Sequence, residues 1–266
     1  MTPEEHASAA AVLLRAEETR TQIGLLSLAH PDMTMDDAYA IQNEILSAKI
    51  AQGRQIAGWK IGLTSRAMQT ALNIDVPDSG ILFDDMEFAN GIEVPAGRFI
   101  QPRIEAEIAF VMRDTISGQD VTRKDILTAT ECVAPALEIL DTRIQRADPA
   151  SGQARIITDT ISDNAANAGF VLGSKRHDVD AHDLRWVPAI VFKDGDVEET
   201  GLGAGVLNDP VESVCWLARR MACYGQRIEA GQVILSGSFI RPLECPPGTR
   251  IHADYGAFGT ADIAFA

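Results

Sequence analysis

The stretch Arg103–Met112 (RIEAEIAFVM) constrains the fold of this chain more than any other. Its alternation predicts a β-strand, because side chains two residues apart lie on the same face of a strand. Glu105 and Glu107 then lie on one face, about 7 Å apart along the strand, and the other face is wholly apolar. One alternative is that both glutamates simply face solvent, as charged residues on the wet face of a strand often do.

A third carboxylate favours a different interpretation. Glu138 lies within Val133–Leu140 (VAPALEIL), a run that is otherwise apolar on both faces and therefore predicts a strand buried on both sides. A carboxylate buried there needs a cation, hydrogen-bond donors or a raised pKa. Converging acids without a neighbouring thiol or imidazole favour a hard divalent cation, so Glu105, Glu107 and Glu138 are predicted to bind Mg²⁺ or Mn²⁺.

Composition excludes several classes of protein. The chain has 266 residues, enough for one large domain, and a formal charge of -15, which argues against a nucleic-acid partner. No apolar run reaches the length of about 18 residues that a membrane span needs, and no signal peptide is visible. The four cysteines are scattered without metal-site spacing, which predicts reduced thiols and a cytoplasmic location.

Two helices are predicted at the start of the chain. The first runs from about Pro3 to Thr21, with Ala9, Val12, Leu13 and Ala16 as its packing face. A capping pattern at Thr34–Asp37 begins the second helix, which buries Ala38, Ile41, Ile45, Leu46 and Ile50 and ends near Gly53. We therefore predict an N-terminal helical appendage over 1–55 and a β-rich catalytic domain over 56–266.

Lys60 lies in a short apolar strand at the start of the second region. It could be a cation that protects a sheet edge from aggregation. Alternatively, apolar surroundings could lower its pKa and make it available for proton transfer. The residues that follow, Gly62–Ser65, lead into a helix predicted from Arg66 to Leu72, and its start could bind a substrate carboxylate.

Two polar segments allow both a structural and a functional interpretation. Pro77–Gly80 predicts a turn, in which Asp78 would usually only cap the backbone. Thr158–Gly169 is rich in small and amide side chains, typical of a capped short helix or of a polar wall over a pocket.

The remaining segments complete an α+β pattern. A hairpin is predicted over Ala189–Glu198 around Asp194-Gly195, and a helix begins at Pro210 after a cap at Asn208 or Asp209. Short strands are predicted at Val233–Leu235, Arg250–Tyr255 and Ala261–Phe265. Regular strand-helix alternation is missing, so a doubly wound parallel sheet is not expected.

Six ordered motifs resemble those of the fumarylacetoacetate hydrolase superfamily, and the resemblance extends from about Pro31 to Phe265. Within it, the motifs look most like those of the 2-oxohept-4-ene-1,7-dioate hydratases of homoprotocatechuate degradation. The motifs are Gly58–Ser65 (GWKIGLTS), Pro77–Gly80 (PDSG), Pro102–Phe110 (PRIEAEIAF), Pro135–Glu138 (PALE), Ser162–Gly169 (SDNAANAG) and Gly237–Pro242 (GSFIRP).

This resemblance implies a mixed β-roll core, a bound magnesium ion, a homo-oligomer and a small 2-oxo or 2-hydroxydienoate substrate. The residue roles that it implies are metal ligation by Glu105, Glu107 and Glu138, proton transfer by Lys60 and Asp78, and contact with the substrate carboxylate by Leu63, Thr64 and Ser162. Ser79 departs from the pattern, since relatives carry an aromatic residue there, and the smaller side chain could widen the pocket.

Other functions remain open at this stage. The vinylogous 2-oxo acid decarboxylases share the metal-binding acids and the lysine strand, although Ser162–Gly169 looks closer to the hydratases. A carbon-carbon hydrolase would want a histidine-centred base, and none stands out. A non-catalytic subunit that pairs with an aldolase or a decarboxylase is a further alternative. A second substrate carboxylate would want a cation such as Arg241 or Arg103.

Overall fold

The computed structural model describes residues 1–66, 69–70 and 76–266. Part of the helix predicted from Arg66 to Leu72 therefore lies outside the described residues. The helices are α1 (Pro3–Thr19), α2 (Leu26–Ala29), α3 (Met35–Ala51), α5 (Arg123–Ala129), α6 (Ile157–Ser162) and α7 (Pro210–Cys223). The strands are β1 (Ile56–Gly62), β2 (Asp78–Phe83), β3 (Glu87–Phe88), β4 (Glu93–Val94), β5 (Arg103–Met112), β6 (Thr130–Leu140), β7 (Asn167–Leu172), β8 (Pro188–Lys193), β9 (Asp196–Leu202), β10 (Val233–Leu235), β11 (Leu243–Glu244), β12 (Arg250–Asp254) and β13 (Thr260–Phe265).

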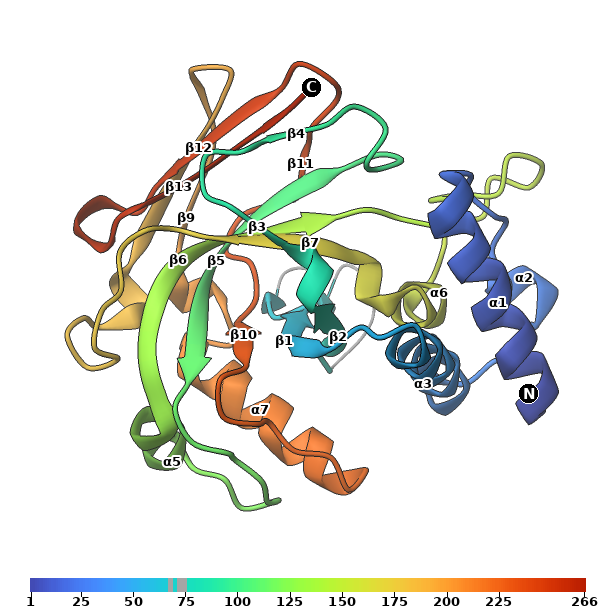
Figure 1. Cartoon of the computed structure of the whole chain (residues 1–266), viewed down its shortest axis with the longest axis horizontal. Helices are drawn as coiled ribbons and strands as arrows, with labels where there is room; N and C mark the ends of the chain where they lie inside the picture. Colours follow the sequence, from blue (N-terminus) through green and yellow to red (C-terminus); the bar gives the residue numbers. More distant parts are fainter. Residues whose placement is uncertain (67–68, 71–75) are drawn as a thin grey trace.

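Two sheets form the β-rich part of the molecule, and both curl strongly (Figure 1). The larger is an eight-stranded sheet in the order β2-β1-β10-β5-β6-β7-β3, with β11 paired to β5 as a branch. The smaller is five-stranded, in the order β4-β13-β12-β8-β9. Both are mixed, because β1 pairs with β10, β3 with β7 and β4 with β13 in parallel while the other pairs are antiparallel. The predicted α+β class with a mixed β core is confirmed.

The large sheet is stabilised by an apolar core on one of its faces. The long strands β5 and β6 lie at its centre, paired over most of their length from Arg103 with Leu140 onward. The apolar face of β5, including Ile104, Ile108 and Phe110, is fully buried. Burial of side chains this large stabilises the sheet by about 1.5–3 kcal/mol each. The backbone of β5 and β6 is thereby a rigid platform for the glutamates on its other face.

The N-terminal helices lie together at one end of the molecule, next to α6 (Figure 1). Their buried residues form a second apolar cluster that also includes Ile144 and Ile161. Ser27 adds a polar contact, since its backbone N–H and its hydroxyl both donate to the Asp159 carboxylate at 2.9 and 2.7 Å. The division into 1–55 and 56–266 stays a prediction, and the helices share their core with residues beyond position 55.

Several predicted details are confirmed. Thr34 and Thr122 both cap helices through reciprocal bonds with an aspartate three residues later, and Asp209 caps α7. The hairpin between β8 and β9 turns at Asp194 and Gly195, whose φ values of 55° and 96° have the sign that a type I′ turn requires.

Other details of the prediction were wrong. Asp78–Gly80 is the start of strand β2 rather than a turn, because it pairs antiparallel with β1, with Gly80 opposite Lys60. On the helices, Val12 and Ile50 are 44% and 48% exposed, so the buried stripe of each helix is narrower than its apolar residues suggested.

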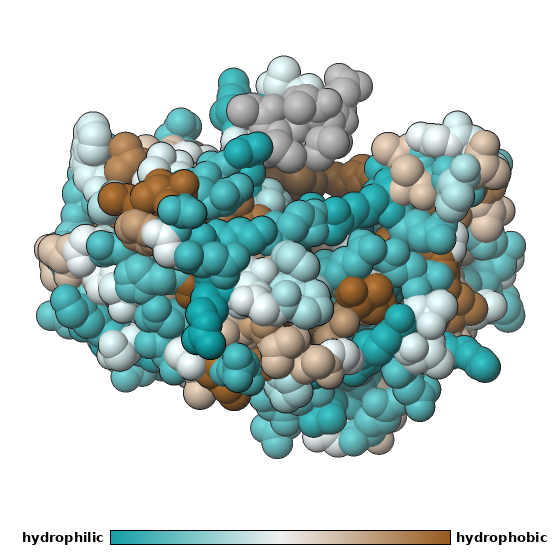
Figure 2. All heavy atoms as spheres, turned by 90° about the horizontal axis from the view of Figure 1, so that it is seen from above, coloured by the Kyte–Doolittle hydropathy of each residue, from teal (hydrophilic) through white to brown (hydrophobic). Residues whose placement is uncertain are grey.

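The outer surface agrees with the acidic composition. The face shown in Figure 2 is mostly hydrophilic, with apolar side chains in scattered places. Among the described residues, no helix combines the length and the apolar character that crossing a membrane requires.

Candidate active site and metal centre

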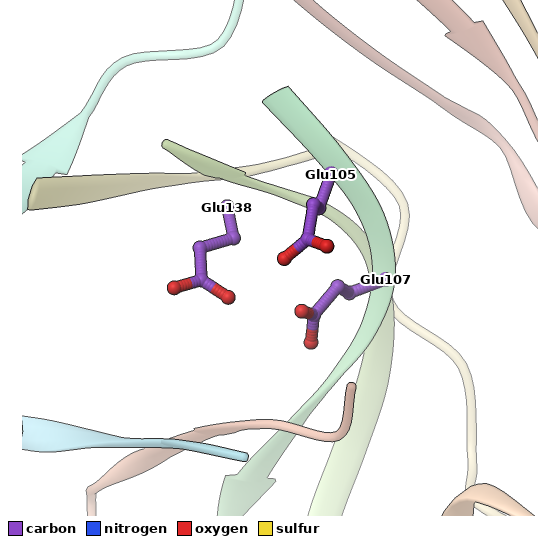
Figure 3. A group of neighbouring side chains, drawn as sticks. All are labelled: Glu105, Glu107 and Glu138. Atoms are coloured by element: carbon purple, nitrogen blue, oxygen red, sulfur yellow. The ribbon is translucent and has the colours of Figure 1, made fainter. Parts of the chain in front are cut away.

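Three glutamates converge on one point above the large sheet. Glu105 and Glu107 come from β5, and Glu138 comes from β6, where it is directly paired with Glu105. Their carboxylates turn toward a common space (Figure 3), and one oxygen from each lies within 4.8 Å of the others. Alternation within β5 and the register between β5 and β6 therefore place all three acids on the same face.

Each of the two deepest carboxylates has one oxygen fixed by a donor and one that is free. Glu107 Oε2 accepts the backbone N–H of Gly237 at 2.6 Å, and Glu138 Oε1 accepts Nδ2 of Asn167 at 2.8 Å. Glu107 Oε1 and Glu138 Oε2 are buried and have no hydrogen-bond partner within the described ranges. Buried acceptors without donors are costly unless a cation binds them, so this donor set fits a divalent metal ion.

The electrostatics of the site support the same conclusion. Burial, followed by the charge of Glu138, raises the pKa of Glu105 to about 8. Burial and the other two glutamates also raise the pKa of Glu107 well above its usual value. Three buried carboxylates therefore repel one another, and a hard cation between them would relieve this repulsion.

Lys60 is the cation nearest to these acids in the described structure. Its ammonium Nζ lies 3.2 Å from Glu138 Oε1, and its side chain is almost completely buried. β1 lies between β2 and β10, so Lys60 does not protect a sheet edge. Burial alone would lower its pKa, but the charges of Glu138, Asp78 and the other two glutamates raise it. Without a bound cation, these carboxylates therefore shift the pKa of Lys60 in the direction opposite to the expected lowering.

Asp78 lies at the start of β2, opposite Gly62 of β1. Burial raises the pKa of its carboxyl group, and Oδ1 has no hydrogen-bond partner among the residues described. A Cβ atom added to Gly62 would lie 2.2 Å from Asp78 Oδ1 and 3.0 Å from Lys60 Nζ. Only glycine fits there, and the two predicted proton-transfer groups approach the same point of the backbone.

A cavity of about 910 Å³ opens beside these groups. Its lining includes Lys60, Asp78 and Glu105 together with Leu63 and Thr64. This volume is at the upper end of the range of about 300–1,000 Å³ that is usual for small-molecule sites. The structure thus brings together most of the residues that the sequence nominated.

Ser162 is the exception among the predicted substrate-binding residues. Its side chain is completely buried, and its hydroxyl donates to the carbonyl of Thr158 at 2.8 Å within α6. It does not line the cavity, because the helical turn of α6 directs the hydroxyl back along the helix. Ala165 and Ala166, three and four residues later, line the cavity instead.

Two contacts in the site were missed by sequence reasoning. Asn167 holds Glu138, and the backbone of Gly237 holds Glu107. Asn167 lies in a segment already noted for its amide side chains, which was the available signal. The role of Gly237 depends on a backbone N–H, which no side-chain pattern reveals.

Comparison with known proteins finds close relatives for this chain, although no protein-family profile matches it. It is 48% identical over 260 residues to the 2-oxo-hept-4-ene-1,7-dioate hydratase of Escherichia coli, covering 98% of this chain and 97% of the relative. It is also 40% identical over 238 residues to the 2-hydroxyhexa-2,4-dienoate hydratase of Comamonas testosteroni, covering 89% and 88% of the two chains.

Among solved structures, the fold is similar to that of the 4-oxalocrotonate decarboxylase from Pseudomonas putida G7, described as complexed with magnesium and adipate. The TM-score is 0.94 at 32% sequence identity, and the match covers 100% of this chain and 99% of the decarboxylase. The whole architecture, including the N-terminal helices, is therefore shared with that protein.

Proposed function

Because this chain belongs to the fumarylacetoacetate hydrolase superfamily, in its hydratase and decarboxylase branch, we propose that it is a hydro-lyase acting on 2-oxo-alkenoates. The proposed substrate is 2-oxohept-4-ene-1,7-dioate or its 2-hydroxyhepta-2,4-diene tautomer, and the product is 4-hydroxy-2-oxoheptanedioate, formed in the breakdown of aromatic compounds. The observation that carries this proposal is the cavity that Lys60, Asp78 and Glu105 line together, in a chain 48% identical to a hydratase named for that substrate.

We propose Mg²⁺ as the cation of the three-glutamate site, with Mn²⁺ as the alternative. Glu105, Glu107 and Glu138 would each supply one oxygen, which leaves positions for substrate. When bound, the ion would polarise the C1 carboxylate and C2 oxygen of the substrate. Gly237 and Asn167 support this role. Each donates a hydrogen bond to one oxygen of Glu107 or Glu138 and thereby orients the carboxylate, whose second oxygen stays available for the ion.

Lys60 and Asp78 are proposed to move the protons of the reaction. Hydration requires a proton at C5, which converts the dienol into an α,β-unsaturated ketone, and then addition of water at C4. The raised pKa of Lys60 keeps its ammonium protonated and so available as the proton donor, whereas the raised pKa of Asp78 makes its carboxylate a stronger acceptor for a proton of the attacking water.

Leu63 and Thr64 are proposed to contact the carboxylate end of the substrate. Both line the cavity beside Lys60. Leu63 has a φ of 57°, in the left-handed region, and its carbonyl accepts Nε2 of Gln69 at 2.8 Å. The Thr64 carbonyl accepts the N–H of Leu207 at 3.1 Å, so the loop is held from both sides.

Two further features of the proposal concern assembly. We propose a homo-oligomer, as the family resemblance implies. An aldolase is the partner that the chemistry favours, because a 4-hydroxy-2-oxo acid is suited to retro-aldol cleavage.

The competing function is a vinylogous 2-oxo acid decarboxylase, favoured by the fold shared with the Pseudomonas putida enzyme. The deciding experiment supplies 2-hydroxyhepta-2,4-diene-1,7-dioate with magnesium, follows the loss of dienol absorbance and identifies the product by mass spectrometry. We expect a gain of one water and full inhibition by EDTA. In a parallel assay with 4-oxalocrotonate, loss of CO₂ without hydration of either substrate would make the protein a decarboxylase. Absence of both reactions would favour a non-catalytic partner subunit.

A further inference from the structure

Two arginines, Arg103 and Arg155, line the cavity. Arg103 begins β5, and Arg155 lies in the loop before α6, where its backbone N–H donates to the carbonyl of Arg146 at 3.0 Å. Both side chains line the same cavity as Lys60 and Glu105. Nη1 of Arg155 is buried and has no hydrogen-bond partner within the described part of the chain.

The acids near these arginines are already occupied. Glu244 accepts two bonds from Arg146, at 2.5 and 3.2 Å, whereas Arg103 Nε lies 3.7 Å from the same carboxylate. Asp163, the acid that most favours the charge of Arg155, is bonded to Arg143 through both its side chain and its backbone. Burial and the like charges of neighbouring arginines lower the pKa of Arg155. Among the described residues, Arg155 therefore keeps an Nη1 free to bind an anion, next to Arg103, whose own ion pair with Glu244 is long at 3.7 Å.

Arg241, which also lines the cavity, is paired and exposed to solvent. Arg241 forms an ion pair with Glu199, which also lines the cavity, and its side chain is 78% exposed. Its charge is thus matched by its own partner and surrounded by solvent. The sequence offered Arg103 and Arg241 for a second substrate carboxylate, and both line the cavity; Arg155 was not among the residues considered.

We propose that Arg155, assisted by Arg103, binds the C7 carboxylate of the substrate and thereby selects dioates over short 2-hydroxydienoates. This inference rests on the proposed function, which places the C1 end of the substrate at the glutamates. A guanidinium can hold a carboxylate through two parallel hydrogen bonds, and a buried one without a partner gains most from doing so. Ile157 and Phe239 also line the cavity and offer apolar contact for the methylene at C6.

The first test compares two substrates of the magnesium-loaded enzyme: 2-hydroxyhepta-2,4-diene-1,7-dioate and 2-hydroxypenta-2,4-dienoate, which lacks the distal carboxylate. We expect Arg155→Gln to lower kcat/KM for the dioate by about 100-fold, chiefly through KM, because loss of one partner of a desolvated charge pair leaves the other charge unpaired. The value for the short substrate should stay unchanged. Arg155→Lys should restore part of the loss.

Arg241→Gln is the matched control, since it removes the same type of side chain from the same cavity. We expect it to keep the native ratio of the two kcat/KM values. If Arg241→Gln lost the dioate selectively while Arg155→Gln did not, the distal carboxylate would bind at Arg241, and the inference would be wrong. Equal losses on both substrates in Arg155→Gln would instead give Arg155 a purely structural role.

A binding test separates this inference from the proposed reaction. 2-Oxoheptanedioate and 2-oxopentanoate carry the same 2-oxo acid head, but neither has a double bond to hydrate. Titration calorimetry with magnesium present should show that Arg155→Gln weakens binding of the dioate by at least about tenfold and leaves 2-oxopentanoate unchanged. This result would support the inference even if the product assay excluded hydration, and equal dioate binding by both proteins would refute it.

Discussion

At the scale of single residues, the site depends on one buried lysine among four carboxyl groups. Lys60 Nζ is 3.2 Å from Glu138, and Glu138, Asp78, Glu105 and Glu107 all raise its pKa. A lysine in this environment keeps its proton until a reacting atom accepts it. Its charge also partly neutralises the acids when no metal is bound. Its removal is therefore expected to lower turnover but not to weaken metal binding.

Lys60→Met should therefore reduce turnover by about 10²–10⁴-fold, the usual contribution of a positioned acid or base. Magnesium should bind at least as tightly as in the native protein, because a competing positive charge beside Glu138 has been removed. Steady-state kinetics and titration calorimetry measure the two effects. Lys49→Met is the matched control, since Lys49 is also buried and is paired with Glu17 at 2.7 Å, but it does not line the cavity. Near-native kcat in Lys60→Met would remove this residue from the mechanism.

Glu138→Gln tests the metal site at the same scale. The amide oxygen can still accept Nδ2 of Asn167, so shape and packing are kept while one negative charge is lost. We expect magnesium affinity to fall by at least about tenfold, together with turnover, because carboxylate charge dominates the binding of this hard cation. Calorimetry compares this variant with Glu131→Gln, which changes an exposed glutamate on the same strand. Unchanged affinity in Glu138→Gln would contradict its role as a ligand.

At the scale of elements, the segment between α6 and β7 joins the metal site to the strand of Asp78. Asn164, Ala165 and Ala166 have φ values of 52°, 51° and 60°, a left-handed run that is costly for residues other than glycine. Asn164 offsets this cost by binding the middle of β2, where its side chain accepts Ile81 N–H at 2.7 Å and donates to Ile81 C=O at 2.9 Å. The run places Ala165 and Ala166 in the cavity wall and ends at Asn167, which holds Glu138.

Asn164→Ala should lower the free energy of unfolding by about 2–4 kcal/mol, because it leaves two buried backbone groups of Ile81 without partners. Urea unfolding followed by circular dichroism measures this difference. Asn43→Ala, on the exposed face of α3, is the control and should change the free energy by less than about 0.5 kcal/mol. A cost below about 1 kcal/mol in Asn164→Ala would mean that the segment is held chiefly by other contacts.

At the scale of the whole molecule, the three buried glutamates link folding to pH and to the metal. The pKa of Glu105 is about 8 in the metal-free fold, against a usual value of 4.5, so the folded state binds more protons than the unfolded chain between these values. Metal-free stability contributed by this group is therefore greatest at low pH and is lost as pH rises toward about 8. Magnesium binds the ionised carboxylates, so its stabilising effect should grow over the same range.

The expected result is a melting temperature that falls from about pH 5 to about pH 8 in EDTA, and an increase on adding magnesium that becomes larger across this range. Differential scanning calorimetry at fixed ionic strength measures both. Glu105→Gln should flatten the slope in EDTA, while Glu131→Gln should keep it. A magnesium effect independent of pH would show that these carboxylates are already ionised in the metal-free protein.

Sequence reasoning predicted the fold class and the three converging acids because the relevant information is local. Alternation within Arg103–Met112 places Glu105 and Glu107 on one face of a strand, and the apolar neighbours of Glu138 make its burial predictable. Capping at Thr34 and Thr122 depends on side chains three residues apart. The turn predicted at Asp78 failed because pairing with β1 outweighs the local preference of Pro77–Gly80.

By itself, the sequence determined the strand-rich α+β class and nominated the three acids, since periodicity and burial of charge are properties of short segments; it was the family resemblance that grouped Lys60 with them. Only the tertiary structure decided the pairing of Glu105 with Glu138, the raised rather than lowered pKa of Lys60, and the exclusion of Ser162 from the cavity. It alone placed Arg155 in the cavity lining, with an Nη1 that has no hydrogen-bond partner among the described residues. These features depend on distances between residues far apart in the chain, which are fixed by how the strands and loops pack.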